Sequence, residues 1–78
     1  MMTTFPCVSA RFKFWNGKHE YTVEYNYGIS MWFVFNNEET TDCVYKKEDK
    51  KIPFNKINMY SAANILVDFI DSKNKSTN

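Results

Sequence analysis

The sequence offers few side chains that could act as a nucleophile, a general base or a soft metal ligand. It has one histidine, His19, and two cysteines, Cys7 and Cys43. A catalytic Cys–His pair must lie within hydrogen-bond reach, and the strand order predicted below separates Cys43 from His19 by two strands. Three potential ligands without motif spacing also fall short of the four that structural zinc takes. We therefore expect no catalytic residue and no metal site, and we interpret His19 as a residue at the rim of the core.

The acidic residues do not indicate an acid–base pair either. Two carboxylate doublets, at residues 38–39 and 48–49, lie in stretches that we expect to be solvated loops. A glycosidase-type pair needs two carboxyl groups that face one cleft, and a single small sheet offers none. The glycines, Gly17 and Gly28, are too far apart for a phosphate-binding loop. The sequence favours a function without catalysis and without a cofactor.

Composition limits the size and the class of the molecule. The 78 residues fit one small domain over residues 1–78, and an aromatic share of 18% is too high for a disordered chain. A net charge of +1 gives little attraction to the phosphates of a nucleic acid. There is no apolar run long enough to span a membrane and no signal-peptide pattern. We therefore expect a cytoplasmic protein that does not use a membrane.

Residue types with AT-rich codons (Phe, Tyr, Met, Ile, Asn and Lys) far outnumber those with GC-rich codons (Gly, Ala, Arg and Pro). Such a bias indicates an AT-rich genome. Together with the small size, it is typical of proteins from phages and mobile elements. The expected partner is then a protein of the host cell, and the expected role is that of an inhibitor or modulator.

The strongest local signal is Asn16-Gly17, which lies between two runs of alternating apolar and polar residues. Asn-Gly is a preferred two-residue hairpin turn, because both central positions need a positive φ. This turn pairs Trp15 with Lys18 and collects the apolar residues of both strands on one face. Those residues are Val8, Ala10, Phe12, Phe14, Tyr21, Val23 and Tyr25.

Gly28 predicts the second turn. A three-residue loop over 26–28, with the glycine in the left-handed conformation, pairs Tyr25 with Ile29. In this register Trp32 and Val34 point to the outer face of the sheet. The core face then continues through the third strand with Ile29, Met31, Phe33 and Phe35.

A polar loop over residues 36–40 leads to a fourth strand. The expected register directs Cys43 and Tyr45 toward the core and places Val44 beside Trp32 on the outer face. Residues 46–51 are expected to form a charged, exposed loop.

The C-terminal part has a different period. Residues 52–54 are a candidate short fifth strand, and Pro53 restricts it to an edge. Beyond them, apolar residues recur at helical spacing. Asn58 or Ser61 is the expected N-cap of this helix, and residues from about 73 to 78 are expected to form a frayed polar tail. The residues at helical spacing are Ala62, Ile65, Leu66, Phe69 and Ile70.

These elements predict an α+β domain of β-β-β-β-α order. A four-stranded antiparallel meander with one apolar face has to cover that face. The single C-terminal α-helix is the only available cover.

The predicted outer face carries a large aromatic residue where polar residues are usual. Exposed patches of this kind often mark partner sites, and Trp and Arg are enriched at binding hot spots. We predict a protein-binding surface there, made of Arg11, Lys13, Trp15, Thr22, Trp32, Val34 and Val44.

Three alternatives remain open. The same face could bind nucleic acid by stacking bases on its tryptophans between basic residues, although Glu20 and Glu24 weaken this reading. A homodimer could bury the patch around Trp32. A local stack of Arg11 on Trp32 would also account for an exposed indole. The nucleic-acid platform would consist of Arg11, Lys13, Trp15, Lys18 and Trp32.

Overall fold

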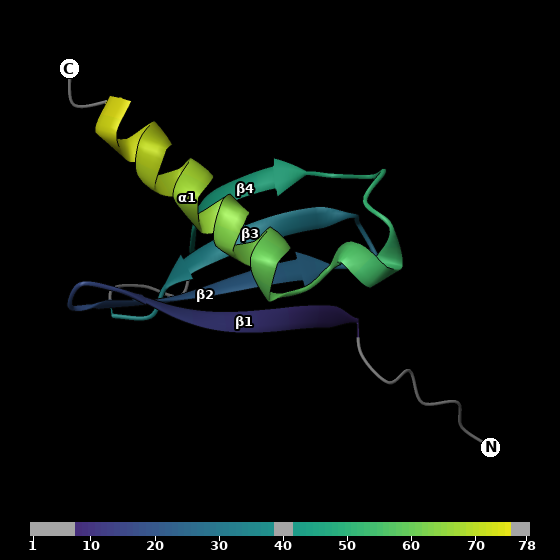
Figure 1. The fold of residues 1–78 in the computed structure, drawn as a ribbon, viewed down its shortest axis with the longest axis horizontal. Helices are drawn as coiled ribbons and strands as arrows, with labels where there is room; N and C mark the ends of the chain where they lie inside the picture. Colours follow the sequence, from purple (N-terminus) through teal and green to yellow (C-terminus); the bar gives the residue numbers. More distant parts are fainter. Residues whose placement is uncertain (1–7, 39–41, 76–78) are drawn as a thin grey trace.

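The computed structural model describes residues 8–38 and 42–75. In these residues a four-stranded antiparallel sheet precedes a short 3-10 helix and a C-terminal α-helix (Figure 1). The sheet order is β1-β2-β3-β4, so the predicted α+β meander of β-β-β-β-α order is confirmed. Cys7 lies outside the described residues. The elements are β1 (Ser9–Asn16), β2 (His19–Asn26), β3 (Met31–Asn36), β4 (Cys43–Glu48), η1 (Phe54–Lys56) and α1 (Met59–Lys75).

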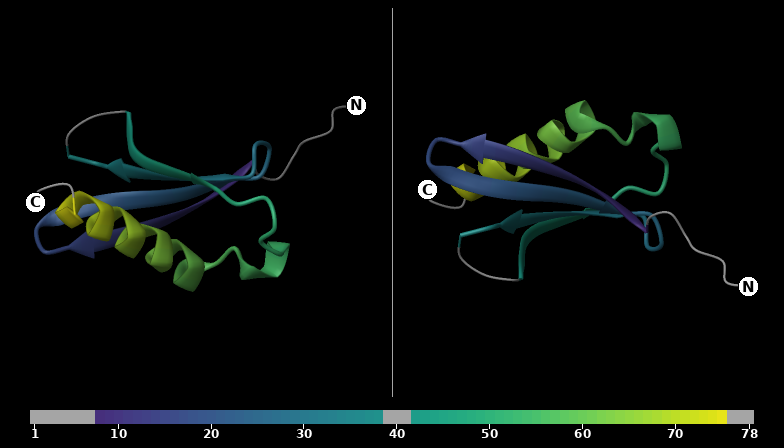
Figure 2. Two further views of the ribbon diagram at one scale, coloured as in Figure 1. Left: turned by 90° about the horizontal axis from the view of Figure 1, so that it is seen from above. Right: turned by 90° about the horizontal axis from the view of Figure 1, so that it is seen from below.

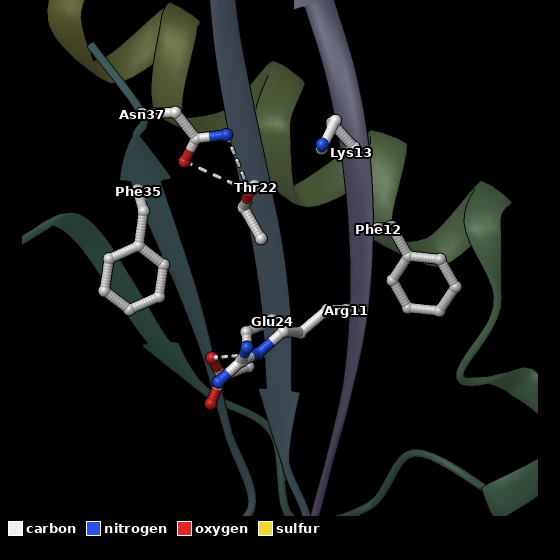
Figure 3. A pocket seen from close by; sticks show the side chains of 7 residues that line it. All are labelled: Arg11, Phe12, Lys13, Thr22, Glu24, Phe35 and Asn37. Atoms are coloured by element: carbon white, nitrogen blue, oxygen red, sulfur yellow. Dashed lines mark hydrogen bonds and ion pairs between the residues drawn. The ribbon is translucent and has the colours of Figure 1, made fainter.

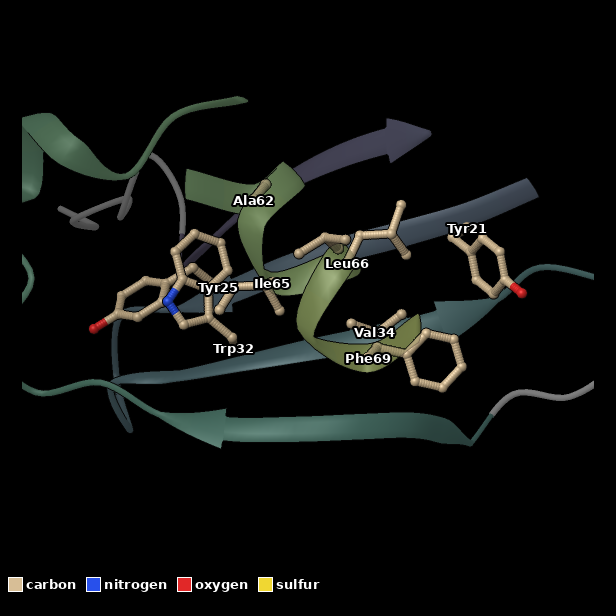
Figure 4. Close-up of a cluster of buried hydrophobic side chains, with 9 residues drawn as sticks. Tyr21, Tyr25, Trp32, Val34, Ala62, Ile65, Leu66 and Phe69 are labelled. Atoms are coloured by element: carbon tan, nitrogen blue, oxygen red, sulfur yellow. The ribbon is translucent and has the colours of Figure 1, made fainter. Parts of the chain in front are cut away.

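Helix α1 packs diagonally across one face of the twisted sheet, and no other described element covers the opposite face (Figure 2). We call the uncovered side the outer face. The core lies between α1 and the two central strands (Figure 4). Its buried side chains are Tyr21, Val23, Tyr25, Trp32, Val34, Ala62, Ile65, Leu66 and Phe69.

The first hairpin has the predicted faces but a different turn. Asn16 pairs with His19, so the two-residue loop is Gly17-Lys18 and Trp15 lies opposite Glu20 instead of Lys18. Gly17 has a φ of 65°, whereas Asn16 remains in the strand. Because the register differs from the predicted one by two residues, the side chains keep their faces.

The second turn overturns the predicted register of β3. Tyr25 pairs with Trp32 instead of Ile29, a shift of three residues that exchanges the two faces of the strand. The side-chain Oδ1 of Asn26 accepts hydrogen bonds from the backbone N–H groups of Gly28 and Ile29, at 2.9 and 3.2 Å. The left-handed residue of this turn is Ser30, with a φ of 55°, and not Gly28. The loop is therefore one residue longer than expected.

Strand β4 contains a bulge that also changes the expected pairing. Tyr45 lies opposite Val34 and Cys43 lies opposite Phe35, which leaves Val44 as the extra residue. Val44 packs against the core, so its predicted place on the outer face is wrong. The register expected for this strand is therefore wrong as well.

The segment after β4 differs from the prediction in two respects. β4 continues to Glu48, so the first half of the expected loop over 46–51 is strand. Residues 52–54 form no strand: Pro53, with a φ of −66°, precedes η1, which begins at Phe54. The ring of exposed Phe54 lies 5.5 Å from that of Tyr27, centroid to centroid.

Helix α1 begins directly after Asn58, one of the two predicted N-cap residues. The backbone N–H of Ser61 donates to Oδ1 of Asn58 at 3.0 Å, which identifies Asn58 as the N-cap. The Ser61 hydroxyl donates to the backbone carbonyl of Lys56. The helix reaches Lys75, and residues 76–78 of the predicted polar tail lie outside the described residues. Four of the five predicted core positions are buried, and Ile70 packs against them.

Candidate functional site on the outer face

Three of the seven predicted contact residues belong to the interior. Trp32 and Val34 have 0% of their surface exposed, and Val44 packs against the same core. The expectation that Trp32 lies on the outer face is therefore wrong. The cause is the odd shift in register at the turn after β2, which turns Trp32 and Val34 toward α1.

The other predicted residues remain outside the core. Arg11, Lys13 and Thr22 line the outer face, and exposed Trp15 lies beside the first turn. The exchange of faces in β3 brings to this surface three side chains that the predicted register directs toward the core. We call them the β3 stripe: Met31, Phe33 and Phe35.

The β3 stripe is an apolar band along the middle of the outer face. Its three side chains are only partly buried, and the rings of Phe33 and Phe35 lie 6.4 Å apart, centroid to centroid. Phe33 faces Glu24 on β2 and Lys46 on β4. The stripe is therefore bordered by charged residues.

Two ion pairs connect β1 to β2 across this face. Arg11 Nε lies 3.2 Å from Glu24 Oε1, and Lys13 Nζ lies 3.4 Å from Glu20 Oε2. The carboxylate side chains are 14% and 24% exposed, whereas those of the cations are 71% and 66% exposed. The acids therefore lie flat on the sheet, and the cationic side chains project at its β1 edge. Exposed ion pairs add little to stability, so their main effect here is to orient Arg11 and Lys13.

A shallow hollow of about 580 Å³ lies between the ion pairs and the β3 stripe. On one of its sides Thr22 Oγ1 and the Asn37 side-chain amide form hydrogen bonds of 2.9 and 3.1 Å (Figure 3). Phe35 on β3 and Arg11 on β1 also line the hollow (Figure 3). The hollow thus presents an aromatic ring, an amide and a guanidinium group.

His19, which the sequence places at the rim of the core, is exposed, and its ring lies 6.4 Å from that of buried Tyr21, centroid to centroid. Its Nδ1 is 2.9 Å from Oε1 of Glu38, and both side chains are largely exposed. The pair joins the start of β2 to the segment that follows β3. Over residues 8–38 and 42–75, no group of three or more His, Cys, Asp or Glu residues is arranged to hold a metal ion.

One signal in the sequence could have indicated the correct register of β3. Asn26 precedes Tyr27-Gly28, and an asparagine at the start of a turn often accepts hydrogen bonds from the backbone two residues on. A turn closed in that way does not require Gly28 to be left-handed. A longer loop would then have placed Phe33 and Phe35 on the outer face.

Comparisons with protein-family models, with curated proteins and with solved structures find no match to this chain. In the part of the chain that the structure describes, no helix is long and apolar enough to cross a membrane.

Proposed function

We propose that this protein is a non-enzymatic module that binds another protein through the outer face of its sheet. The observation that carries the proposal is the β3 stripe. Met31, Phe33 and Phe35 form a partly exposed apolar band on a face that no described element covers. Protein interfaces typically combine an apolar centre of this kind with a polar, solvent-accessible rim.

The surroundings of the stripe support a protein partner. Glu20 and Glu24 accompany Arg11 and Lys13, so the face carries both signs of charge. Mixed charges favour a partner with a complementary pattern, and they fix its orientation. Trp15, which is 67% exposed, adds an aromatic side chain at one end of the face. In view of the AT-rich codon bias, we propose that the partner is a host-cell protein that this module inhibits or modulates.

The three alternatives considered from the sequence all depend on an exposed Trp32. A nucleic-acid platform built on Trp32 lacks its central ring, because that indole is buried. Two of the three cations of the platform, Arg11 and Lys13, are paired with carboxylates. A homodimer that buries Trp32 and a stack of Arg11 on Trp32 are disfavoured for the same reason.

The test compares two immobilised variants with the wild type in extracts of the native host. Phe33→Ser/Phe35→Ser removes the centre of the stripe, and Phe54→Ser removes an exposed phenylalanine from η1 as a matched control. We expect the wild type and the control to retain the same protein, which the double variant loses. Near-ultraviolet circular dichroism verifies that each variant is folded. A partner that the double variant retains equally well, or the absence of any retained protein, contradicts the proposal.

A further inference from the structure

We propose that the edge of β1, with which no further described strand pairs, accepts an extended segment of a partner protein as an added antiparallel strand, in which acidic side chains alternate with apolar ones. The inference rests on the proposed function in taking the partner to be a protein. It concerns the edge of β1 and not the β3 stripe, so the two can fail separately.

The backbone of β1 has a row of hydrogen-bonding groups that β2 does not use. In a hairpin with a two-residue loop, the residues that flank the loop exchange hydrogen bonds, and bonded pairs then alternate along the ladder. Asn16 and His19 flank the loop here. In the same phase, the carbonyl of Val8 accepts from the N–H of Tyr27 at 2.9 Å. The N–H and C=O groups that point away from β2 are therefore those of Ser9, Arg11, Lys13 and Trp15.

The two edges of the sheet differ in how open they are. β4 has a bulge, three consecutive charged residues at 46–48, and a Lys47 Nζ–Asp68 Oδ2 contact of 3.2 Å that ties it to α1. A bulge discourages the addition of a strand, and the contact with Asp68 engages the side chain of Lys47. β1 pairs with β2 in regular register over Ser9–Asn16, and it contains no proline. The open edge is therefore β1.

The side chains of β1 specify the chemistry of the added strand. On the outer side, the cations Arg11 and Lys13 project from the edge, while their glutamate partners lie against β2. On the helix side, Phe12 and Phe14 are only partly buried. Because directly opposed residues of adjacent strands share a face, an added strand would place acids beside the cations and apolar side chains beside the phenylalanines.

Helix α1 extends this apolar side. The side chain of Asp68 contacts Lys47 on β4, so this side of the helix faces β4. At about 100° per residue, Ala63, Val67 and Ile70 lie on the other flank, toward β1. Val67 is exposed and Ile70 is partly buried. The added strand would therefore find apolar surface below it as well as beside it.

The test uses an acetylated and amidated hexapeptide of alternating valine and glutamate. Amide hydrogen exchange is followed by NMR in the wild-type protein. The amides of Arg11, Lys13 and Trp15 should exchange rapidly in the free protein and at least about tenfold more slowly with saturating peptide. A peptide with lysine in place of glutamate should give no protection. Unchanged exchange with the glutamate peptide, or equal protection by the lysine peptide, overturns the proposal.

Two N-methylated peptides test the ladder without altering the protein. In an antiparallel addition, the glutamates opposite Arg11 and Lys13 exchange backbone bonds with them, while the valine N–H groups point away. Methylation of the glutamate nitrogens should therefore abolish protection, and methylation of the valine nitrogens should leave it in place. Protection that survives in both peptides overturns the proposal, since binding would then not use the backbone.

A proline substitution in the protein also tests whether binding uses the backbone hydrogen bonds of β1. The N–H of Lys13 points away from β2, so Lys13→Pro removes an edge donor while it spares the β1–β2 ladder. Lys13→Ala is the matched control for the lost charge. We expect the proline variant to bind the glutamate peptide at least about tenfold more weakly than the alanine variant, which is the loss of about one hydrogen bond in free energy. Equal affinities overturn the proposal.

The last experiment repeats the exchange measurement with an oligothymidylate that has the same net charge as the glutamate peptide. If it protects the same amides more strongly than the glutamate peptide, the edge recognises anionic polymers in general and the proposal is overturned. If the peptide protects β1 while no protein is captured through the β3 stripe, the edge site stands and the proposed use of the outer face fails.

Discussion

Trp32 lies directly opposite Tyr25 on the neighbouring strand, and the two rings pack edge to face at a centroid separation of 4.9 Å. Figure 4 shows the indole nitrogen beside that ring. Nε1 of Trp32 is buried and has no conventional hydrogen-bond acceptor among the described residues. The Tyr25 hydroxyl in turn donates to the backbone carbonyl of Asp49 at 2.8 Å. The pair thus connects the centre of the core to the segment after β4.

Truncation of this indole should be among the most destabilising changes in the molecule. Trp32→Ala removes a completely buried aromatic side chain, which typically costs about 3–5 kcal/mol, whereas Trp15→Ala should cost less than about 0.5 kcal/mol because Trp15 is exposed. Urea denaturation measures both values. A larger loss for Trp15→Ala than for Trp32→Ala would contradict the register of β3.

The two tryptophans should also be distinguishable by fluorescence. Trp15→Phe leaves only the buried indole, whose emission should be blue-shifted and poorly quenched by acrylamide. Trp32→Phe leaves the exposed indole, which should emit at longer wavelength and be readily quenched. Similar quenching of the two variants would show that Trp32 is accessible to solvent.

Gly17 should be the conformationally demanding position of the first hairpin. Its φ of 65° lies in the left-handed region, and a Cβ at this position would meet no atom within 4 Å. Gly17→Ala should therefore cost about 1 kcal/mol through backbone strain alone. Gly17→Asn should cost less, because asparagine tolerates this conformation better than alanine. Thermal denaturation of the two variants measures the difference, and equal or reversed losses would argue against the Gly17-Lys18 turn.

The N-cap of α1 offers a test that is independent of the sheet. Asn58→Ala removes the acceptor for the Ser61 N–H and should destabilise the protein by about 1 kcal/mol. Asn58→Asp keeps an acceptor and adds a negative charge at the N-terminal end of the helix, so it should preserve stability. Chemical denaturation gives both values. A neutral Asn58→Ala would mean that another residue caps the helix.

The helix and the order of the strands could be predicted because several local signals agreed on them. The spacing of Ala62, Ile65 and Phe69 fits a helix and not a strand. Asn58 precedes the helix as its capping residue. Alternation on both sides of Gly17 fits a hairpin even when its turn is misplaced by one position. Arg11 and Lys13 therefore kept their predicted face.

The position of Trp32 could not be predicted from alternation, because β3 is apolar on both faces. Trp32 and Val34 form one apolar set, and the β3 stripe forms another of similar hydrophobicity. Only the length of the preceding loop distinguishes the two registers. That length depends on hydrogen bonds from the Asn26 side chain and on a left-handed Ser30, which no pattern of hydrophobicity reveals.

The loop between β2 and β3 therefore determines which aromatic side chains the molecule displays. Insertion or deletion of one residue there would rotate β3 about its own axis, enclose Phe33 and Phe35, and expose the indole. Both arrangements offer the helix a hydrophobic partner, so such a change need not abolish folding. A single codon gained or lost at this position gives evolution a route by which this small scaffold could acquire a different recognition surface.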